Sequence, residues 1–362
     1  MRAAGLVPAT VGSALLVFAA RASPLWLQRH AFQPGYFTPP GAGAAWAVRG
    51  LLALFGAGLL LLALRLRSWG ALLRSGLAIL LALLAVEGAL RLVEKPETQS
   101  RNPRLEARLG EPDPQLGWKL TPSRTTEVQV WRGQRRARYA IDAQGDRAPA
   151  QDFVEDADAP TLLLTGESIA FGHALDWGEA LPGLLQRALD VQVIDVAVGG
   201  YGSDQAYLRL AEALPRFRRV VATVTLFVPV QLGRNLRNFR PRLALHDGAL
   251  VPLPGSPSRL RLGRLFLDEL PLFSDAGLDE SVRLTRAILD RTAQLAPALF
   301  VLVDSGEPKG ATGWLDEPLF KGLRFVRVEL RRDQLLADGH PDAAATQQIA
   351  QAVAAGLRRG GQ

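Results

Sequence analysis

The chain has 362 residues, a net charge of +7, no cysteine and four histidines. The lack of cysteine excludes disulfide bonds and thiolate metal sites, and four dispersed histidines show no ligand spacing, so we expect no metal and no other cofactor. Although the chain is basic, no stripe of arginines alternates with aromatic residues, and we do not expect nucleic-acid binding.

Three apolar stretches precede residue 93: Ala3 to Ala20, Trp46 to Leu64 and Ala71 to Leu92. Each approaches the ~20 residues that a helix needs to cross a bilayer, so residues 1–92 are predicted to form a membrane region with three transmembrane helices. Two alternatives stay open, a secretory signal in the first stretch and a buried helical bundle made of all three.

The predicted orientation depends on the basic connection Arg65 to Trp69. The positive-inside rule favours a cytoplasmic turn there, although arginines at the opposite connection nearly balance the count. The interpretation is a multi-pass protein of the cell membrane whose remaining domains lie on the extracytoplasmic, periplasmic side.

Residues 93–156 are predicted to form a small β-rich preamble. Two short runs rich in β-branched residues, 125–131 and 138–142, flank the turn Arg132-Gly133-Gln134, which is the pattern of paired strands. This segment is too short to hold a large core alone.

Residues 157–362 alternate apolar runs with helical patterns, as βαβ units do. The fold class predicted is α/β, with a flavodoxin-like, three-layer, doubly wound parallel sheet of about five strands. The expected strands are 161–165, 191–197, 220–228, 298–303 and 324–328, and the expected helices are 178–190, 203–214, 279–295 and 341–358. An insertion at about 232–278 contains the hairpin signal Asp247-Gly248, and either shapes the substrate site or is a plain structural elaboration.

Ser168 follows directly on the first of these strands. The C-terminal end of a strand is where open α/β sheets bind ligands and can expose a nucleophile. A serine hydroxyl is a weak nucleophile unless an imidazole takes its proton and a third group orients that imidazole.

Of the four histidines, only His340 has the position expected of the base. It follows the last strand, and Asp338 is two residues away and able to orient it. His30 lies between apolar stretches, His246 lies in the hairpin turn, and His173 is close to the serine and is interpreted as pocket wall. The alternative is that Asp338 and Pro341 are ordinary helix-start residues and that the histidine between them lies at the surface.

The sequence around the serine, Gly166 to Gly172, resembles the first block of the SGNH hydrolases, the GDSL esterase and lipase superfamily, with Glu167 in place of the usual aspartate. Val198 to Gln205 is similar to the second block, in which the amide of Gly200 would donate to the oxyanion. The aspartate and histidine named above match the last block. Upstream segments, 113–118 and 141–147, look like the β preamble of exported or membrane-linked members, which supports an extracytoplasmic domain.

The third family block departs from the pattern. By spacing, Val230 stands where the family has an oxyanion asparagine, and Gln231 where an aspartate follows. Losing one oxyanion donor costs roughly 100- to 1000-fold in turnover. Gln231 or Asn235 could supply an amide instead, although neighbouring residues on a strand face opposite ways.

The resemblance implies a membrane-anchored serine hydrolase that cleaves or transfers an ester-linked acyl group, with Ser168 as nucleophile, His340 as base and Asp338 orienting it. The amides of Ser168 and Gly200, and possibly Gln231, would bind the oxyanion. The expected partners are the membrane and an acylated envelope glycan or lipid. The alternative function is a catalytically weakened SGNH domain that binds carbohydrate or protein in an envelope assembly.

Overall fold

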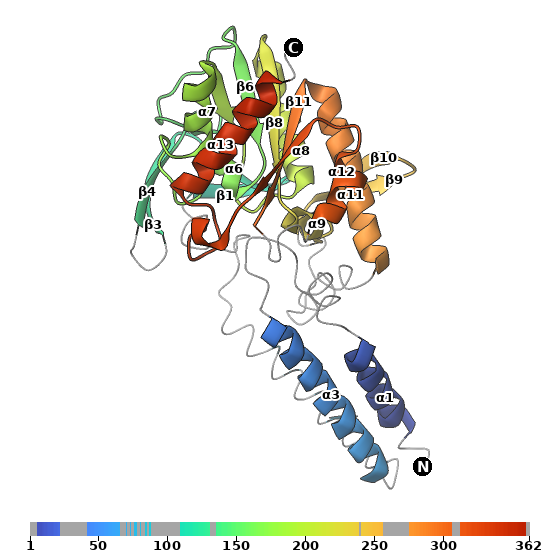
Figure 1. Cartoon of the computed structure of the whole chain (residues 1–362). Coiled ribbons are helices and arrows are strands. Elements are labelled where there is room, and N and C mark those ends of the chain that lie inside the picture. The colour runs from blue at the N-terminus through green and yellow to red at the C-terminus, as the bar shows by residue number, and fades with distance from the viewer. Residues whose placement is uncertain are drawn as a thin grey trace. The chain divides into compact units, whose positions relative to one another are not determined.

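The computed structural model describes residues 6–21, 42–65, 109–130, 135–238, 240–255, 275–305 and 312–359, with a few single positions between 70 and 87 (Figure 1). The chain divides into two compact units. One contains the helices α1 (Leu6–Arg21) and α3 (Ala42–Arg65), and the other contains the described residues from 109 onward.

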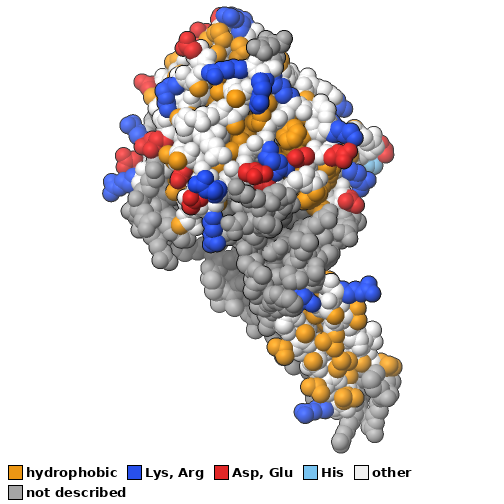
Figure 2. Space-filling view, in the orientation of Figure 1, with side chains coloured by type: hydrophobic (Ala, Val, Ile, Leu, Met, Phe, Trp, Pro, Cys, Tyr) orange, Lys and Arg blue, Asp and Glu red, His pale blue; other side chains and the backbone are white. Residues whose placement is uncertain are grey.

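Helices α1 and α3 approach each other closely at two glycines. A Cβ atom on Gly12 would lie 2.7 Å from the carbonyl oxygen of Gly56, and one on Gly56 would lie 2.9 Å from that of Gly12. Arg49 donates to the carbonyl oxygens of Ala19 and Ala20 at 2.9 and 3.3 Å, which satisfies acceptors left free at the C-terminal end of α1. Apolar side chains such as Leu54 and Leu64 are exposed in this unit, and hydrophobic side chains are scattered over the face that Figure 2 shows.

The prediction of three transmembrane helices is wrong, because no helix among the described residues is long and apolar enough to cross a membrane. Helix α1 has 16 residues, fewer than the ~20 required. In α3, Arg49 interrupts the apolar sequence, and the run Gly50 to Leu64 rises only ~22 Å against a ~30 Å hydrocarbon core. Most of the third stretch lies outside the described residues.

The second unit is built around a parallel sheet that contains all five of the expected strands. These are β6 (Thr161–Thr165), β7 (Gln192–Asp195), β8 (Val220–Phe227), β11 (Ala298–Asp304) and β12 (Phe325–Glu329), in the spatial order β12-β11-β8-β6-β7. Neighbouring strands are parallel. From β6 the chain first adds β7 on one side and then β8 on the other, and such a switch point in strand order is where this class of sheet places its site.

The sheet is mixed and has eight strands, which corrects the prediction of about five parallel ones. The preamble adds β5 (Arg147–Ala148), β4 (Arg135–Ile141) and β3 (Arg124–Val130), each antiparallel to its neighbour. Tyr139 and Ile141 on β4 are fully buried and belong to the main core. The edge of β7 is therefore covered by the preamble and not left open for other chains to pair with.

Two hairpins lie outside this sheet. One pairs β1 (Gly110–Asp113) with β2 (Gly117–Leu120), and the other pairs β9 (Arg242–His246) with β10 (Ala249–Leu253). The second hairpin turns at Asp247 and Gly248, both with positive φ, as the expected two-residue turn requires. The rest of the expected insertion, from residue 256 to 274, lies outside the described residues.

Helices cover both faces of the parallel strands (Figure 1). Helices α7 (Leu181–Leu189) and α13 (Ala343–Arg358) lie on one face, and α8 (Ser203–Ala213) and α11 (Asp275–Leu295) lie on the other. Strand β11 illustrates why both faces are covered. Its successive residues Val301 and Leu302 point to opposite faces, and both are completely buried, in two different core clusters. Near-continuous apolar sequence is what a strand covered on both faces needs.

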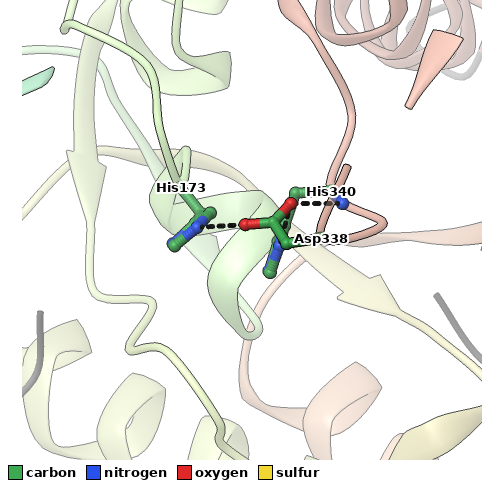
Figure 3. A group of neighbouring side chains, drawn as sticks. All are labelled: His173, Asp338 and His340. Atoms are coloured by element: carbon green, nitrogen blue, oxygen red, sulfur yellow. Dashed lines mark hydrogen bonds and ion pairs between the residues drawn. The ribbon is translucent and has the colours of Figure 1, made fainter. Parts of the chain in front are cut away.

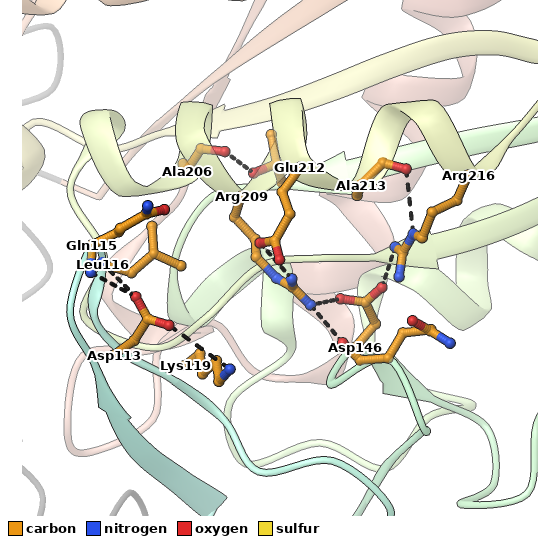
Figure 4. Close-up of polar contacts among 12 residues, drawn as sticks. Asp113, Gln115, Leu116, Lys119, Asp146, Ala206, Arg209, Glu212, Ala213 and Arg216 are labelled. Atoms are coloured by element: carbon orange, nitrogen blue, oxygen red, sulfur yellow. Dashed lines mark hydrogen bonds and ion pairs between the residues drawn. The ribbon is translucent and has the colours of Figure 1, made fainter.

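A buried charge network joins the preamble to α8 (Figure 4). Asp146 accepts from Arg209 Nη2 at 2.6 Å and also from Arg216, and Arg209 contacts Glu212 at 2.8 Å. The carboxylate of Asp146 is almost fully buried. Since a buried charge is tolerated only when it is paired, the network fixes the loop before β5 against α8 and the turn that follows it.

Candidate active site

The serine lies on a sharp turn between β6 and the one-turn helix α6 (Ser168–Phe171). Gly166 has φ 145°, and a Cβ atom there would lie 3.1 Å from both the Cβ and the carbonyl oxygen of Leu226. The backbone conformation and the close approach both require glycine. Glu167 caps the helix by accepting the N–H of Ile169 at 3.0 Å, so Ser168 begins α6 at the carboxyl edge of the sheet.

The imidazole of His340, which is 172 residues later in the sequence, contacts this serine. Its Nε2 atom lies 2.9 Å from Ser168 Oγ. His340 closes a tight turn between β12 and α13, in which its carbonyl oxygen accepts the N–H of Leu336 at 2.7 Å and Gly339 has φ 87°. The structure therefore brings together the serine and the histidine that the sequence singled out.

Asp338 lies between two imidazoles (Figure 3). Its Oδ1 atom is 3.2 Å from His340 Nδ1 and accepts the backbone N–H of His340, also at 3.2 Å. Its Oδ2 atom is 2.9 Å from Nε2 of His173. Burial by itself raises the pKa of Asp338, but the hydrogen bonds and charges of the two histidines outweigh it and hold that pKa well below its usual range. The carboxylate is ionised and faces the base, as an orienting group must.

His173 is the residue whose role the sequence did not indicate, since it was interpreted as pocket wall. Burial lowers its pKa, and the hydrogen bond to Asp338 only partly offsets this, so the imidazole is neutral and donates Nε2–H to the carboxylate. Its ring stacks on that of His340, with 4.0 Å between centroids. The sequence carries no local signal for this contact, because Asp338 is 165 residues away. The backbone N–H of His173 donates to the carbonyl oxygen of Ser168 at 2.8 Å, directly after the single turn of α6.

Glu167 gives the serine a second hydrogen-bond acceptor. Its Oε2 atom lies 2.5 Å from Ser168 Oγ and 3.4 Å from Nη1 of Arg234. Burial raises the pKa of Glu167, but the charge of Arg234 and the serine hydrogen bond outweigh this and lower it overall. An ionised carboxylate therefore competes with His340 for the serine proton.

The second oxyanion donor expected from the sequence, Gly200, lies in the loop after β7, the strand that pairs with β6. It has φ 82°, which favours glycine there. The loops after two neighbouring parallel strands meet at one edge of a sheet, so the amides of Gly200 and Ser168 lie at the same edge.

The divergent third block forms the start of helix α9 (Val230–Asn235), not a strand as expected. Val230 is buried in the main core, and Gln231 lies about 100° further around the helix. The side-chain oxygen of Gln231 accepts from Ser203 Oγ at 3.1 Å, while its Nε2 is buried without an acceptor among the described residues. The amide of Asn235 instead donates to Thr285 Oγ1 at 2.8 Å. Of the two proposed substitutes, Gln231 is thus the one whose amide nitrogen has no acceptor among the described residues.

By residue type, His173, Asp338 and His340 could ligate a metal, since their ligand atoms lie within 4.8 Å of one another. A metal would sit about 2.0 to 2.1 Å from each nitrogen, in the plane of each ring. The two rings are stacked 4.0 Å apart and inclined by only 31°, so their in-plane directions do not converge. The arrangement suits proton transfer and hydrogen bonding better than metal binding.

Comparisons with known proteins reveal only distant similarity. No family model matches the chain, and no curated protein matches it. An acetyl xylan esterase from the rumen bacterium Butyrivibrio proteoclasticus aligns over 57% of this chain and 66% of its own, just under two thirds, with 11% identity and a TM-score of 0.34. A protein from Slackia heliotrinireducens described as "a putative SGNH hydrolase" aligns over 54% and 98%, with 17% identity and a TM-score of 0.30. Structural similarity this low does not indicate a function, so any function must be inferred from the geometry of the site.

Proposed function

We propose that this chain is a serine hydrolase that cleaves or transfers ester-linked acyl groups. The observation that supports it most is the 2.9 Å contact between His340 Nε2 and Ser168 Oγ, with the ionised carboxylate of Asp338 behind the imidazole. A serine, a base and an orienting acid in this order are the parts of a nucleophilic acyl-transfer site.

In the proposed reaction, Ser168 Oγ bonds to the ester carbonyl carbon as its proton passes to His340 Nε2. Collapse of the tetrahedral intermediate breaks the bond to the alcohol, which leaves with that proton. Water or a second hydroxyl then attacks the acyl-enzyme, His340 takes its proton, and the acyl group departs as acid or new ester while the proton returns to Ser168. Asp338 stabilises the imidazolium in both halves.

The oxyanion would be bound by the amides of Ser168 and Gly200 and by the side-chain amide of Gln231. Preorganised donors of this kind contribute most when they need no rearrangement during the reaction. Gln231 fits because Ser203 already fixes its oxygen and leaves its nitrogen free to donate.

The proposed acyl donor is an acylated envelope glycan or lipid, the class of substrate that follows from the predicted extracytoplasmic location beside the membrane. Hydrolysis and transfer use the same protein groups and differ only in the acceptor. The extracytoplasmic location and the membrane as partner stay predictions from the sequence.

A fluorophosphonate probe tests the proposed function directly, because it labels only an activated serine. We expect labelling of the wild type and its loss in Ser168→Ala and His340→Ala. His246→Ala is the matched control, since that imidazole is 78% exposed in the hairpin and its loss should change nothing. A folded wild type that does not react would contradict the proposal and favour the alternative of a binding module.

A further inference from the structure

A second histidine, His173, contacts the proposed catalytic residues Ser168, His340 and Asp338 through Asp338. His173 contributes neither to the nucleophile nor to the base, yet its Nε2 atom lies 2.9 Å from Asp338 Oδ2, and both side chains are largely buried. The two carboxylate oxygens are thereby divided: Oδ1 faces His340, and Oδ2 is held by His173. A carboxylate bound on only one side could rotate away from the imidazole that it orients.

The segment that carries His173 is fixed from two sides. Gly172 has φ 78° and Ala174 has φ 63°, so the chain makes a tight turn on both sides of the histidine. The N–H of Ala174 donates to the hydroxyl of Tyr139 at 2.8 Å. The turn is thus tied to strand β4 of the preamble.

Arg147 on β5 holds the same segment through a second set of contacts. Its fully buried guanidinium donates to the carbonyl oxygens of Phe171, Gly172 and Leu175. It also lies over the rings of Tyr139 and Phe171, at 4.7 and 4.8 Å from their centroids. Side chains fixed in this way are rigid, and rigid support is what a positioning group needs.

The charge state of His173 suits the same role. A neutral imidazole can donate to Asp338 and still stack on His340 without repelling it when His340 becomes positively charged during the reaction. Burial keeps the pKa of His173 below its usual value, which preserves this neutral state.

We propose that His173 is a positioning residue: its Nε2–H holds the carboxylate of Asp338 in the orientation that serves His340. This inference deepens the proposed function and rests on it. Because a displacement of about 1 Å can cost about 100-fold in rate, we expect the loss of this hydrogen bond to lower kcat by roughly 10- to 100-fold with little change in KM.

Two substitutions separate the hydrogen bond from the packing of the ring. His173→Phe keeps an aromatic ring against His340 but removes the donor, while His173→Gln loses the ring but places an amide donor near the position of Nε2. We expect kcat for p-nitrophenyl acetate to fall in the Phe variant and to remain within a few-fold of wild type in the Gln variant. Thermal unfolding of both variants identifies any loss of fold.

The outcomes distinguish failure of the positioning role of His173 from failure of the proposed hydrolase function. If both variants fold and the Phe variant retains wild-type kcat, or the Gln variant is the slower of the two, the positioning role is overturned while the proposed function stands. If the folded wild type shows no Ser168-dependent labelling or turnover, the proposed function fails, and the role of His173 fails with it.

Discussion

If the proposed function is correct, replacing Glu167 with aspartate is expected to raise the rate of ester hydrolysis. Ser168 has one hydroxyl proton and two acceptors, Glu167 Oε2 at 2.5 Å and His340 Nε2 at 2.9 Å. Only the second orientation leads to attack on a substrate. Aspartate is one methylene shorter and remains a good N-cap, so it can still accept the N–H of Ile169 while withdrawing its other oxygen from the serine.

The expected gain follows from the relative strengths of the two hydrogen bonds. A hydrogen bond to a charged group contributes about 1.5 to 3 kcal/mol, and a neutral one about 0.5 to 1.5 kcal/mol. The difference of about 1 kcal/mol favours Glu167 roughly fivefold as acceptor. The serine is then in the competent orientation about one sixth of the time, and because only this fraction reacts, removing the competition raises kcat/KM by up to about sixfold.

The assay is steady-state hydrolysis of p-nitrophenyl acetate by Glu167→Asp, beside the same substitution at Glu317, which is 78% exposed on α12 (Asp316–Phe320). We expect a rise in the first variant and no change in the second. A folded Glu167→Asp protein with lower kcat/KM would refute the reasoning, because it would mean that Glu167 assists the serine.

Two further predictions concern the oxyanion donor and the pH dependence of stability. Gln231→Leu should lower kcat by roughly 100- to 1000-fold with little effect on KM, as loss of one oxyanion donor does. Single-turnover kinetics measure this change. An unchanged kcat would exclude Gln231 from the site. Burial raises the pKa of Glu155 to about 7, despite the opposing charge of Arg216. Between about pH 4.5 and 7 the folded chain then binds more protons than the unfolded chain, so the free energy of unfolding should fall as the pH rises. With allowance for solvent screening, the fall across this window should be about 1 to 2 kcal/mol. Urea unfolding at pH 5 and 7.5 should show this fall in the wild type and a smaller one in Glu155→Gln; equal falls would contradict the assignment.

The parts of the fold that could be predicted are those determined by local patterns. Strands β6, β8 and β11 are nearly continuous apolar runs, and parallel strands covered on both faces need such runs. Ser168 and His340 could be identified because each follows a strand of the parallel sheet, and parallel strands place their carboxyl ends at one edge.

The parts that could not be predicted depend on contacts between distant residues. Nothing within the preamble indicates that β5 pairs with β7 through the single register Arg147 to Asp195. The same is true of His173, whose partner Asp338 is 165 residues away. In α3, composition alone indicated a membrane span, whereas Arg49 binds the end of α1 and divides the apolar run.

The 172-residue separation between Ser168 and His340 determines when the proposed site can form during synthesis. Chains emerge from the N-terminus at about 5 to 20 residues per second, so the nucleophile is made roughly 10 to 30 seconds before its base. Contacts between segments so far apart also form slowly, because a long loop must close first. In the proposed mechanism, a nascent or truncated chain that ends before His340 therefore carries an inert serine, and reactivity towards a fluorophosphonate reports that the turn bearing His340 has docked.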